Sequence, residues 1–162
     1  MRPIALVLGL SLLAAAPPAQ AQNAGHIAQA RRGADCPKCN LFQADFAGLE
    51  IRGRNYAGAR LRQADLSLSV LNRANFSGAD LRDVEAYGAV LSGANFSGAD
   101  LTNASFVGAY LEGANFSGAK LEGVNFAGAE LSSARGLSQN QLNRACGDLS
   151  TRLPKGLNLQ PC

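Results

Sequence analysis

Every fifth position between residues 41 and 131 is apolar, and this pattern dominates the chain. The nineteen positions, called centres below, are large in every case except Ala86: Leu41, Phe46, Ile51, Tyr56, Leu61, Leu66, Leu71, Phe76, Leu81, Ala86, Leu91, Phe96, Leu101, Phe106, Leu111, Phe116, Leu121, Phe126 and Leu131. A period of five matches neither the α-helix, with a period of 3.6 residues, nor the β-strand, with a period of two. The pattern instead predicts a coil of short units that each point one side chain inward.

Small residues flank the centres at fixed positions. Thirteen of the nineteen centres have Ala two residues before them, and twelve have Gly two residues after them. Small residues suit places where the backbone turns inward, and Gly suits corners that require a positive φ. Nineteen five-residue units therefore predict a repeat segment over residues 39–133.

A longer period of twenty residues lies on top of the period of five. The octapeptide at 74–81 recurs at 94–101, and again at 114–121 with Lys120 in place of Asp. Sorted by this period, the centres form an all-Leu column (41, 61, 81, 101, 121) and an aromatic column (56, 76, 96, 116). We expect a square coil with four units per turn and about 4.75 turns. A spacing of about 4.8 Å between turns gives a rod roughly 23 Å long.

The units share the form Ala-(Asp/Asn)-Leu-x-x, as in residues 64–68, 79–83 and 99–103, with Phe at the centre in 74–78. This motif resembles that of the pentapeptide-repeat family, and the resemblance covers about two-thirds of the mature chain. It implies an all-β fold, a right-handed quadrilateral parallel β-solenoid.

Both flanks of the repeats have the character of caps, which repeat proteins require. Ser138 and Gln141 have the spacing of a capping box and predict a C-terminal helix that ends near Gly147. A short helix over 25–34 is expected before the first turn. The predicted organisation is an N-terminal cap at 22–38, the solenoid at 39–133, and a C-terminal helix and tail at 134–162.

The first twenty-one residues have the pattern of a Sec-type signal peptide. Arg2 supplies a positive charge, 4–16 is an apolar run, and Ala19-Gln20-Ala21 is a small-x-small cleavage site. The apolar run is too short to cross a membrane. We expect cleavage before Gln22, no membrane span in the mature chain, and a location in the bacterial periplasm or outside the cell. A retained N-terminal anchor is the alternative.

Four cysteines in an exported chain predict two disulfides. Cys36 and Cys39 precede the repeats, and Cys146 and Cys162 follow them. A disulfide requires Cα atoms within about 7 Å, and the rod separates the two groups by roughly three times that distance. We therefore expect the pairs Cys36–Cys39 and Cys146–Cys162, the second of which fixes the tail 151–161 to the C-terminal cap.

Sequence signals for catalysis are sparse. Cys36-Pro37-Lys38-Cys39 has the C-x-x-C spacing of thioredoxin-like sites, so a redox protein is one alternative function. A zinc site is disfavoured because the two cysteine pairs lie at opposite ends of the rod. His26 is the only histidine and is interpreted as a solvated residue near the terminus. We predict no enzymatic activity, no cofactor, no bound metal and no small-molecule ligand.

Charge is distributed unevenly along the repeats. Residues 39–82 carry a net charge of +2, and residues 83–133 carry −5. Stacking by twenty residues is expected to pair Arg60 with Asp80 and Lys120 with Asp100, and to leave Arg62 and Arg82 without such partners. A column of asparagines (55, 75, 95, 115) is expected to form a side-chain ladder that stabilises the stacking.

Family resemblance raises one further alternative, because some pentapeptide-repeat proteins resemble duplex DNA in shape and charge and inhibit DNA gyrase. Such mimicry requires a long acidic surface and a cytoplasmic location. The short, nearly neutral and exported rod predicted for this chain has neither. We also predict no nucleic-acid binding, since aromatic residues do not alternate with the basic ones.

Apolar residues outside the core gather at one corner of the predicted coil. Stacking groups Leu68 with Val70, Tyr87 with Val90, and Val107 with Tyr110. A contiguous exposed apolar stripe favours an interaction surface, although the chain's own termini could cover it instead. The sequence thus predicts a non-enzymatic exported scaffold that binds a protein partner, most simply a second copy in a homodimer.

Overall fold

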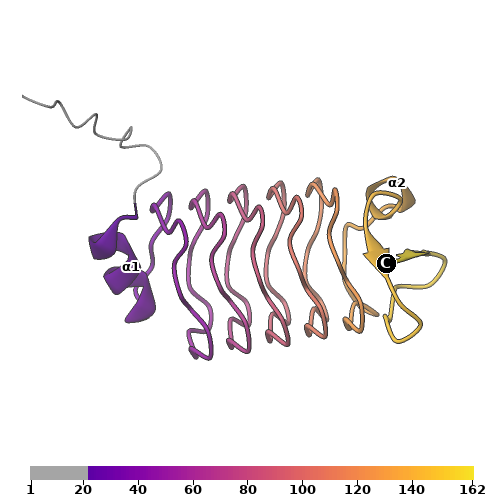
Figure 1. Cartoon of the computed structure of the whole chain (residues 1–162), viewed down its shortest axis with the longest axis horizontal. Helices are drawn as coiled ribbons and strands as arrows, with labels where there is room; N and C mark the ends of the chain where they lie inside the picture. Colours follow the sequence, from indigo (N-terminus) through magenta and orange to yellow (C-terminus); the bar gives the residue numbers. More distant parts are fainter. Residues whose placement is uncertain (1–21) are drawn as a thin grey trace, which may run out of the picture.

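The computed structural model describes residues 22–162. The predicted signal peptide, residues 1–21, and the cleavage before Gln22 therefore lie outside the described residues. The repeats wind into a rod, with an N-terminal helix at one end and the C-terminal elements at the other (Figure 1).

Parallel backbone bridges join residues that are twenty positions apart, and each turn has four of them. The amide of a centre donates to the following turn, as from Phe96 to the carbonyl of Asn115 at 2.8 Å. The amide of the preceding residue donates to the previous turn, as from Asn95 to the carbonyl of Ala74 at 2.9 Å. The predicted stacking period of twenty residues is confirmed.

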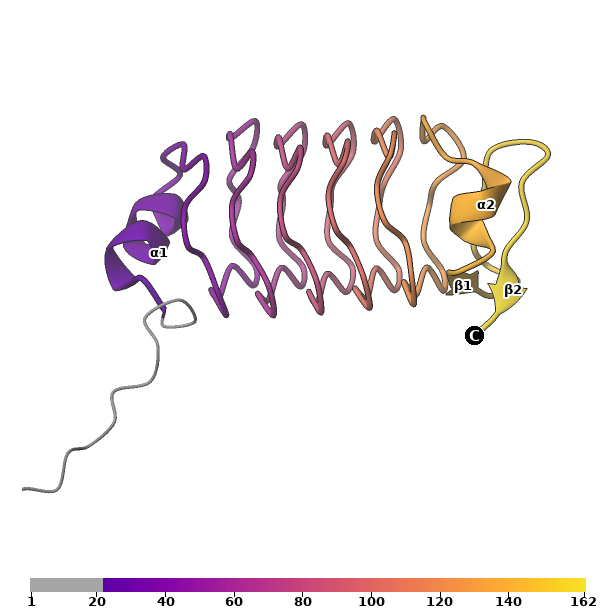
Figure 2. The same ribbon diagram turned by 90° about the horizontal axis from the view of Figure 1, so that it is seen from above.

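The repeats form little continuous sheet. Within them each unit supplies a single bridge residue, because a corner follows two residues later. In the described part of the chain the longer strands are β1 (Cys146–Gly147) and β2 (Gln160–Pro161), which pair in parallel near the C-terminus (Figure 2). The expected all-β architecture is thus a repeat β-fold built mostly from isolated bridges.

All nineteen centres are buried and form the core. The rings of the aromatic column stack in successive turns, with centroid distances of 5.5 Å for Tyr56–Phe76, 5.4 Å for Phe76–Phe96 and 5.2 Å for Phe96–Phe116. Such offset ring pairs contribute about 0.5–1.5 kcal/mol each beyond the burial of their area. The predicted stacking of like centres is confirmed.

The repeat pattern begins one unit before residue 39. Cys36 is fully buried, and its amide donates to the carbonyl of Asn55 at 2.8 Å, as that of Leu41 does to Arg60. Cys39 takes the small inward position two residues before Leu41. Cys36 and Cys39 form a disulfide with a Cα–Cα distance of 5.4 Å, so it ties together the first two units.

Helix α1 (Ala24–Arg31) covers the N-terminal end of the rod and is close to the helix expected over 25–34. Its buried Ala30 accepts a hydrogen bond from the hydroxyl of Tyr56 at 3.5 Å. Burial raises the pKa of Tyr56 to about 12, because removal from water disfavours the phenolate. Arg31 forms an ion pair with Asp45 at 3.2 Å, which further fixes the helix to the first turns.

The interpretation of His26 as a solvated residue is wrong. His26 lies on α1, is half-buried, and its Nδ1 accepts a hydrogen bond from the amide of Asn40 at 3.1 Å. The first turn has no preceding turn to accept from its amides, so a side chain of the capping helix takes this role.

Helix α2 (Gln139–Leu142) caps the other end and begins with the predicted capping box of Ser138 and Gln141. The amide of the Gln141 side chain also donates to the carbonyls of Phe116 and Ala119, at 3.0 and 2.9 Å. The helix ends at Leu142 rather than near Gly147, because Cys146 and Gly147 return to the stack as β1. Cys146 and Cys162 form the second disulfide, which holds β2 beside β1.

Asp148 organises the turn after β1 and gives this end of the rod a pH dependence. Hydrogen bonds from the Ser150 hydroxyl and then the Gly128 amide lower its pKa from 3.8 to about 2. Because the folded pKa lies below the unfolded one, the stabilisation is complete above pH 3.8 and is lost as the pH falls toward 2.

We expect an NMR titration of the Asp148 side-chain carboxyl to show a midpoint near 2. The protection factor of the Gly128 amide, its exchange rate relative to the intrinsic rate at each pH, should fall over the same pH range. In Asp148→Asn the Gly128 amide should lose this pH dependence, whereas a wild-type midpoint near 3.8 would contradict the contact.

Candidate functional site

The six apolar residues of the predicted stripe lie next to one another in the rod. We call them the apolar corner: Leu68, Val70, Tyr87, Val90, Val107 and Tyr110. Backbone bridges join Val70 to Val90 and Val90 to Tyr110. The amide of Leu68 donates to the carbonyl of Tyr87 at 2.8 Å, and Gly88 donates to Val107 at 2.9 Å. The apolar corner therefore spans three successive turns on one side of the rod.

Half or more of each large side chain in the apolar corner is open to solvent. The exposed fractions are 61% for Leu68, 57% for Tyr87 and 51% for Tyr110, whereas the three valines are half-buried. The helix α1 and the C-terminal tail lie at the two ends of the rod and leave this surface open (Figure 1). Covering of the stripe by the chain's own termini is therefore not observed in residues 22–162.

The backbone of Leu68 is strained. Its φ is +57°, at a corner position where most units have Gly. The left-handed conformation costs a residue with a side chain about 1–2 kcal/mol. Leu68 Cδ2 lies 2.9 Å from the place that a Cβ on Gly88 would occupy, so Gly88 leaves room for it. The positive φ follows from the fold, because Gln63 and Arg73 have the same conformation at equivalent corners. What distinguishes Leu68 is the apolar side chain that it exposes there.

Leu149 extends the apolar surface and was missed by the sequence analysis. Its side chain is fully exposed, and the neighbouring Asp148 accepts from the amide of Gly128, in the corner two turns after Tyr87. Leu149 also borders a pocket of about 480 Å³ together with Ala127, Leu159 and Pro161. The strict period of twenty residues does not predict the position of Leu149, because the bridges Asn125–Cys146 and Glu130–Arg152 join residues that are 21 and 22 positions apart.

Charged residues border the apolar corner. Backbone bridges link one residue of each successive turn into a column, called a bridge column below. The bridge column that passes through the apolar corner contains, in order, Glu50, Val70, Val90, Tyr110, Glu130 and Arg152. The neighbouring column on one flank reads Asp45, Asp65, Glu85, Ser105 and Asn125. Hydrogen bonds from Ser132 lower the pKa of Glu130, which also forms an ion pair with Arg152 at 3.4 Å. The surface is thus apolar in the middle, acidic along part of one flank, and charged at both ends.

The asparagine column forms the predicted ladder. Each side-chain amide donates to the side-chain oxygen one turn earlier, from Asn75 to Asn55 at 3.3 Å, and from Asn95 to Asn75 and Asn115 to Asn95 at 3.2 Å. The same oxygens of Asn55, Asn75 and Asn95 accept from backbone amides two residues later. Because these groups bind one another, the ladder serves the stacking of turns.

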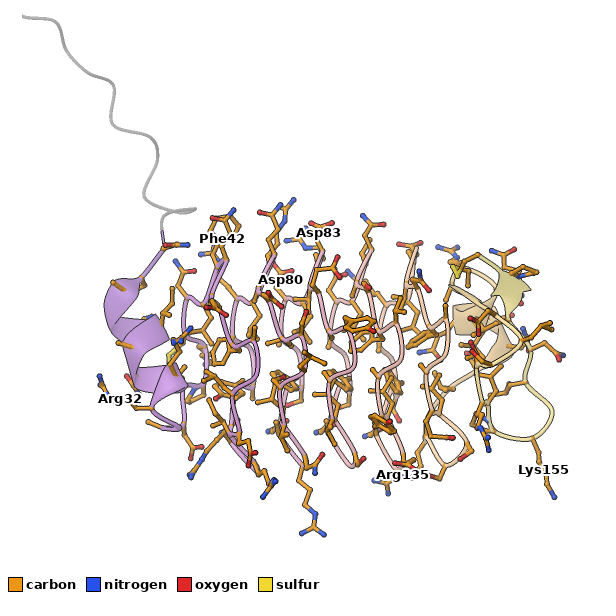
Figure 3. All side chains as sticks on the ribbon, turned by 60° about the horizontal axis from the view of Figure 1, so that its bottom comes forward. Arg32, Phe42, Asp80, Asp83, Arg135 and Lys155 are labelled. Atoms are coloured by element: carbon orange, nitrogen blue, oxygen red, sulfur yellow. A yellow bond between two sulfur atoms is a disulfide. The ribbon has the colours of Figure 1, made fainter. Side chains whose placement is uncertain are left out.

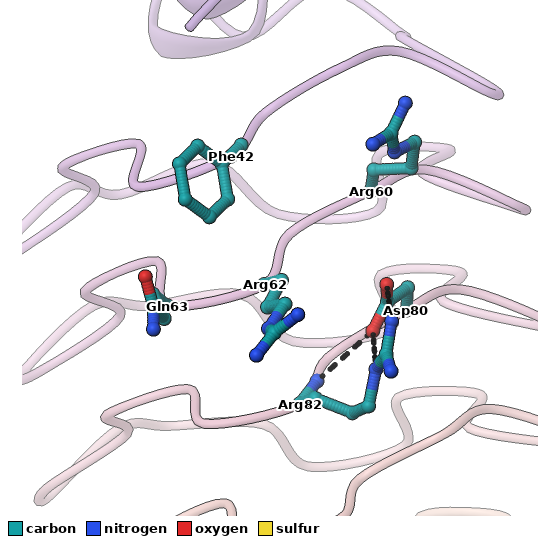
Figure 4. Close-up of a pocket in the computed structure, with 6 residues that line it drawn as sticks. All are labelled: Phe42, Arg60, Arg62, Gln63, Asp80 and Arg82. Carbon is teal, nitrogen blue, oxygen red and sulfur yellow. Dashed lines mark hydrogen bonds and ion pairs between the residues drawn. The ribbon is translucent and has the colours of Figure 1, made fainter. Parts of the chain in front are cut away.

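The corner that holds Arg62 and Arg82, called the basic corner below, contains ion pairs that stacking by twenty residues does not predict. Arg82 donates two hydrogen bonds of 2.7 Å to Asp80, two residues before it (Figure 4). Arg62 lies 3.2 Å from Asp83. Arg62 and Arg82 thus have no carboxylate stacked twenty residues away, as expected, but they find partners within a turn and on the diagonal. The bond from Arg82 is the largest cause of the lowered pKa of Asp80.

A pocket of about 340 Å³ at the basic corner is bordered by Arg62, Asp80 and Arg82, together with Phe42, Arg60 and Gln63. Figure 3 shows Phe42 and Asp83 along the same long edge of the rod. The predicted pair Lys120–Asp100 is confirmed at 3.1 Å. Since the carboxylates already neutralise much of the arginine charge, this corner is a weaker candidate for a binding site than the apolar corner.

The described residues give little support to a chemical site elsewhere. Cys36 and Cys39 are buried and disulfide-bonded, and thiol–disulfide exchange requires access to a sulfur atom. No three His, Cys, Asp or Glu side chains within residues 22–162 gather closely enough to hold a metal ion. None of the helices in that range is both long and apolar enough to cross a membrane.

Comparison with known proteins identifies the repeats. The family model for pentapeptide repeats matches eight copies, over residues 57–85, 81–118 and 109–135. No match is found among curated proteins.

Solved structures with similar folds include three pentapeptide-type proteins. One, from the thylakoid lumen of Arabidopsis thaliana, is 34% identical with a TM-score of 0.34, and the match covers 56% of each chain. This chain therefore spans little more than half of that protein. Full-length QnrB1, a plasmid-mediated fluoroquinolone resistance protein, is 21% identical with a TM-score of 0.41, over 76% of this chain and 78% of that one. A pentapeptide repeat protein from the cyanobacterium Cyanothece 51142 is 24% identical with a TM-score of 0.34, over 80% and 97%.

Proposed function

This chain belongs to the pentapeptide-repeat family, and we propose that it is an exported, non-enzymatic scaffold that binds protein through the apolar corner. The observation that carries this proposal is the contiguous apolar surface, in which Leu68, Tyr87 and Tyr110 are each half or more exposed. Isolated exposed apolar residues are common on soluble proteins, but contiguous patches mark interaction sites. Tyrosine is enriched in such sites because its ring buries a large area while its hydroxyl stays hydrated.

The proposed form of the scaffold is a right-handed quadrilateral β-solenoid of about 4.75 coils. The four bridges per turn support the quadrilateral shape. Export is supported by the sequence of residues 1–21 and by the two disulfides, which persist in oxidising compartments. The bacterial periplasm or the cell exterior is the proposed location.

A non-enzymatic role is supported by the polar side chains, many of which bind other side chains of the same rod. The asparagine ladder and the arginine–aspartate pairs occupy groups that catalysis would need free for a substrate. A gyrase-directed DNA mimic would instead require a continuous acidic surface. The most acidic bridge column changes from Glu85 to Ser105 and Asn125 after three carboxylates, which does not favour that alternative.

Protein capture from an envelope extract tests the proposal. We compare immobilised mature wild type with Tyr87→Ser/Tyr110→Ser, and with Phe42→Ser as a control that removes a partly exposed aromatic ring from another corner. Proteins bound by wild type and by the control should be reduced about tenfold or more with the double variant, since interface tyrosines often contribute 2 kcal/mol or more. Identical sets bound by all three proteins would overturn the role of the apolar corner.

A further inference from the structure

We infer that the apolar corner binds a second copy of this chain, packed side by side with its rod axis reversed. The inference rests on the proposed function, because it names the partner of the same surface. It is carried by the order of residues along two neighbouring bridge columns. When a second rod is turned end over end against the first, this order places complementary side chains opposite one another.

The column through the apolar corner has this self-complementary order. Its residues in successive turns are Glu50, Val70, Val90, Tyr110, Glu130 and Arg152. A two-fold axis perpendicular to the rod, midway between Val90 and Tyr110, places Val90 of one copy opposite Tyr110 of the other. The same axis places Glu50 opposite Arg152 at both ends of the interface. Apolar side chains thus meet at the centre, and opposite charges meet at the ends. Between them Val70 faces Glu130, whose carboxylate is already ion-paired with Arg152 of its own chain.

The flanking column agrees with the same axis. Asp65, Glu85, Ser105 and Asn125 follow one another in successive turns. Reversal places Glu85 opposite Ser105 and Asp65 opposite Asn125, so that each carboxylate faces a side chain that can donate a hydrogen bond. No two carboxylates of this column come opposite one another, although it holds the acidic flank of the apolar corner.

A parallel pair of rods is disfavoured by the same residues. An axis along the rod would place each turn opposite the same turn of the second copy. Glu50 would then face Glu50, Glu130 would face Glu130, and Arg152 would face Arg152. Opposed like charges destabilise an interface and select against that arrangement.

The size of the surface sets the expected affinity. Three large side chains that are half or more exposed, together with three half-buried valines, offer roughly 300–500 Å² of apolar area per copy, within the usual size of a functional patch. Stable interfaces bury about 800 Å² per partner, so this surface and its polar rim lie at the small end. We expect a reversible dimer with a dissociation constant in the micromolar range.

Sedimentation of the mature protein with its disulfides intact tests the dimer. Wild type and Phe42→Ser should dimerise at about 100 µM and dissociate on dilution. Tyr87→Ser/Tyr110→Ser should remain monomeric with an unchanged circular dichroism spectrum. A monomeric wild type at this concentration overturns the inference, and corner-dependent capture of another protein would then leave the proposed function standing. A double variant that still dimerises places the interface elsewhere.

Charge reversal tests the orientation. Antiparallel packing predicts that Glu50→Arg alone and Arg152→Glu alone each dimerise about tenfold more weakly than wild type, because each places like charges at both ends. An equimolar mixture of the two variants should recover wild-type affinity, since both ends of the mixed dimer regain opposite charges. Parallel packing predicts single variants no weaker than wild type and a mixture stronger than wild type, and that result would overturn the antiparallel arrangement.

Discussion

Phe96→Ala is expected to lower the free energy of unfolding by about 3–5 kcal/mol. Phe96 is fully buried, stacks on Phe76 and Phe116, and makes an edge contact with Phe106 at a centroid distance of 5.9 Å. The backbone on both sides is held by hydrogen bonds to adjacent turns, so the cavity cannot close by collapse of a neighbouring unit. Urea denaturation followed by circular dichroism measures the loss.

The next residue supplies a matched control for this substitution. Ser97 follows the centre and lies on the outside of the coil, where the backbone amide rather than the hydroxyl binds Asn95. Ser97→Ala should change the free energy of unfolding by no more than about 0.5 kcal/mol. Equal losses for the two variants would contradict the division into inward centres and outward corners.

Removal of the C-terminal disulfide is the second large expected effect. Cys146→Ala/Cys162→Ala should lower the free energy of unfolding by about 2–5 kcal/mol, because the bond closes a loop between residues sixteen apart. The loss should be concentrated in the tail, since β2 is held beside β1 by only two residue pairs. Thermal denaturation and hydrogen exchange of residues 151–162 measure the two effects.

The N-terminal disulfide is the matched comparison. It joins residues only three apart, for which the chain-entropy model gives a smaller stabilisation of about 2 kcal/mol. Cys36→Ala/Cys39→Ala should therefore cost less and leave exchange in the tail unchanged. Peptide mapping without reduction should recover the two pairs, and a peptide linking Cys36 to Cys146 would show that the ends are joined in another way.

Features that depend on the repeat itself could be predicted from the sequence. Each centre is surrounded by centres from adjacent turns, so the periods of five and twenty determine both burial and neighbours. The stacking of Tyr56 on Phe76 and the ladder from Asn75 to Asn55 follow directly from these periods. The apolar corner was located in the same way, because Val70, Val90 and Tyr110 are twenty residues apart.

Features outside the strict period could not be predicted. Arg82 binds Asp80 two residues before it because a long guanidinium side chain can fold back along its own turn. His26 binds Asn40 through the docking of α1, which no repeat specifies. Leu149 joins the apolar surface only because extra residues in the C-terminal cap shift the register from twenty to 21 and 22. Long side chains, caps and insertions therefore limit the sequence-based prediction.

The bridge period of twenty residues also bears on how such a rod can change length during evolution. Duplication of a whole twenty-residue block, such as 81–100, would keep all columns in register and leave both caps unchanged. Duplication of one five-residue unit would instead rotate everything beyond it by a quarter turn. Val70 and Tyr110 would then lie on different sides, and the apolar surface would be split. Growth in whole turns is thus the route by which a longer descendant could retain the same binding face.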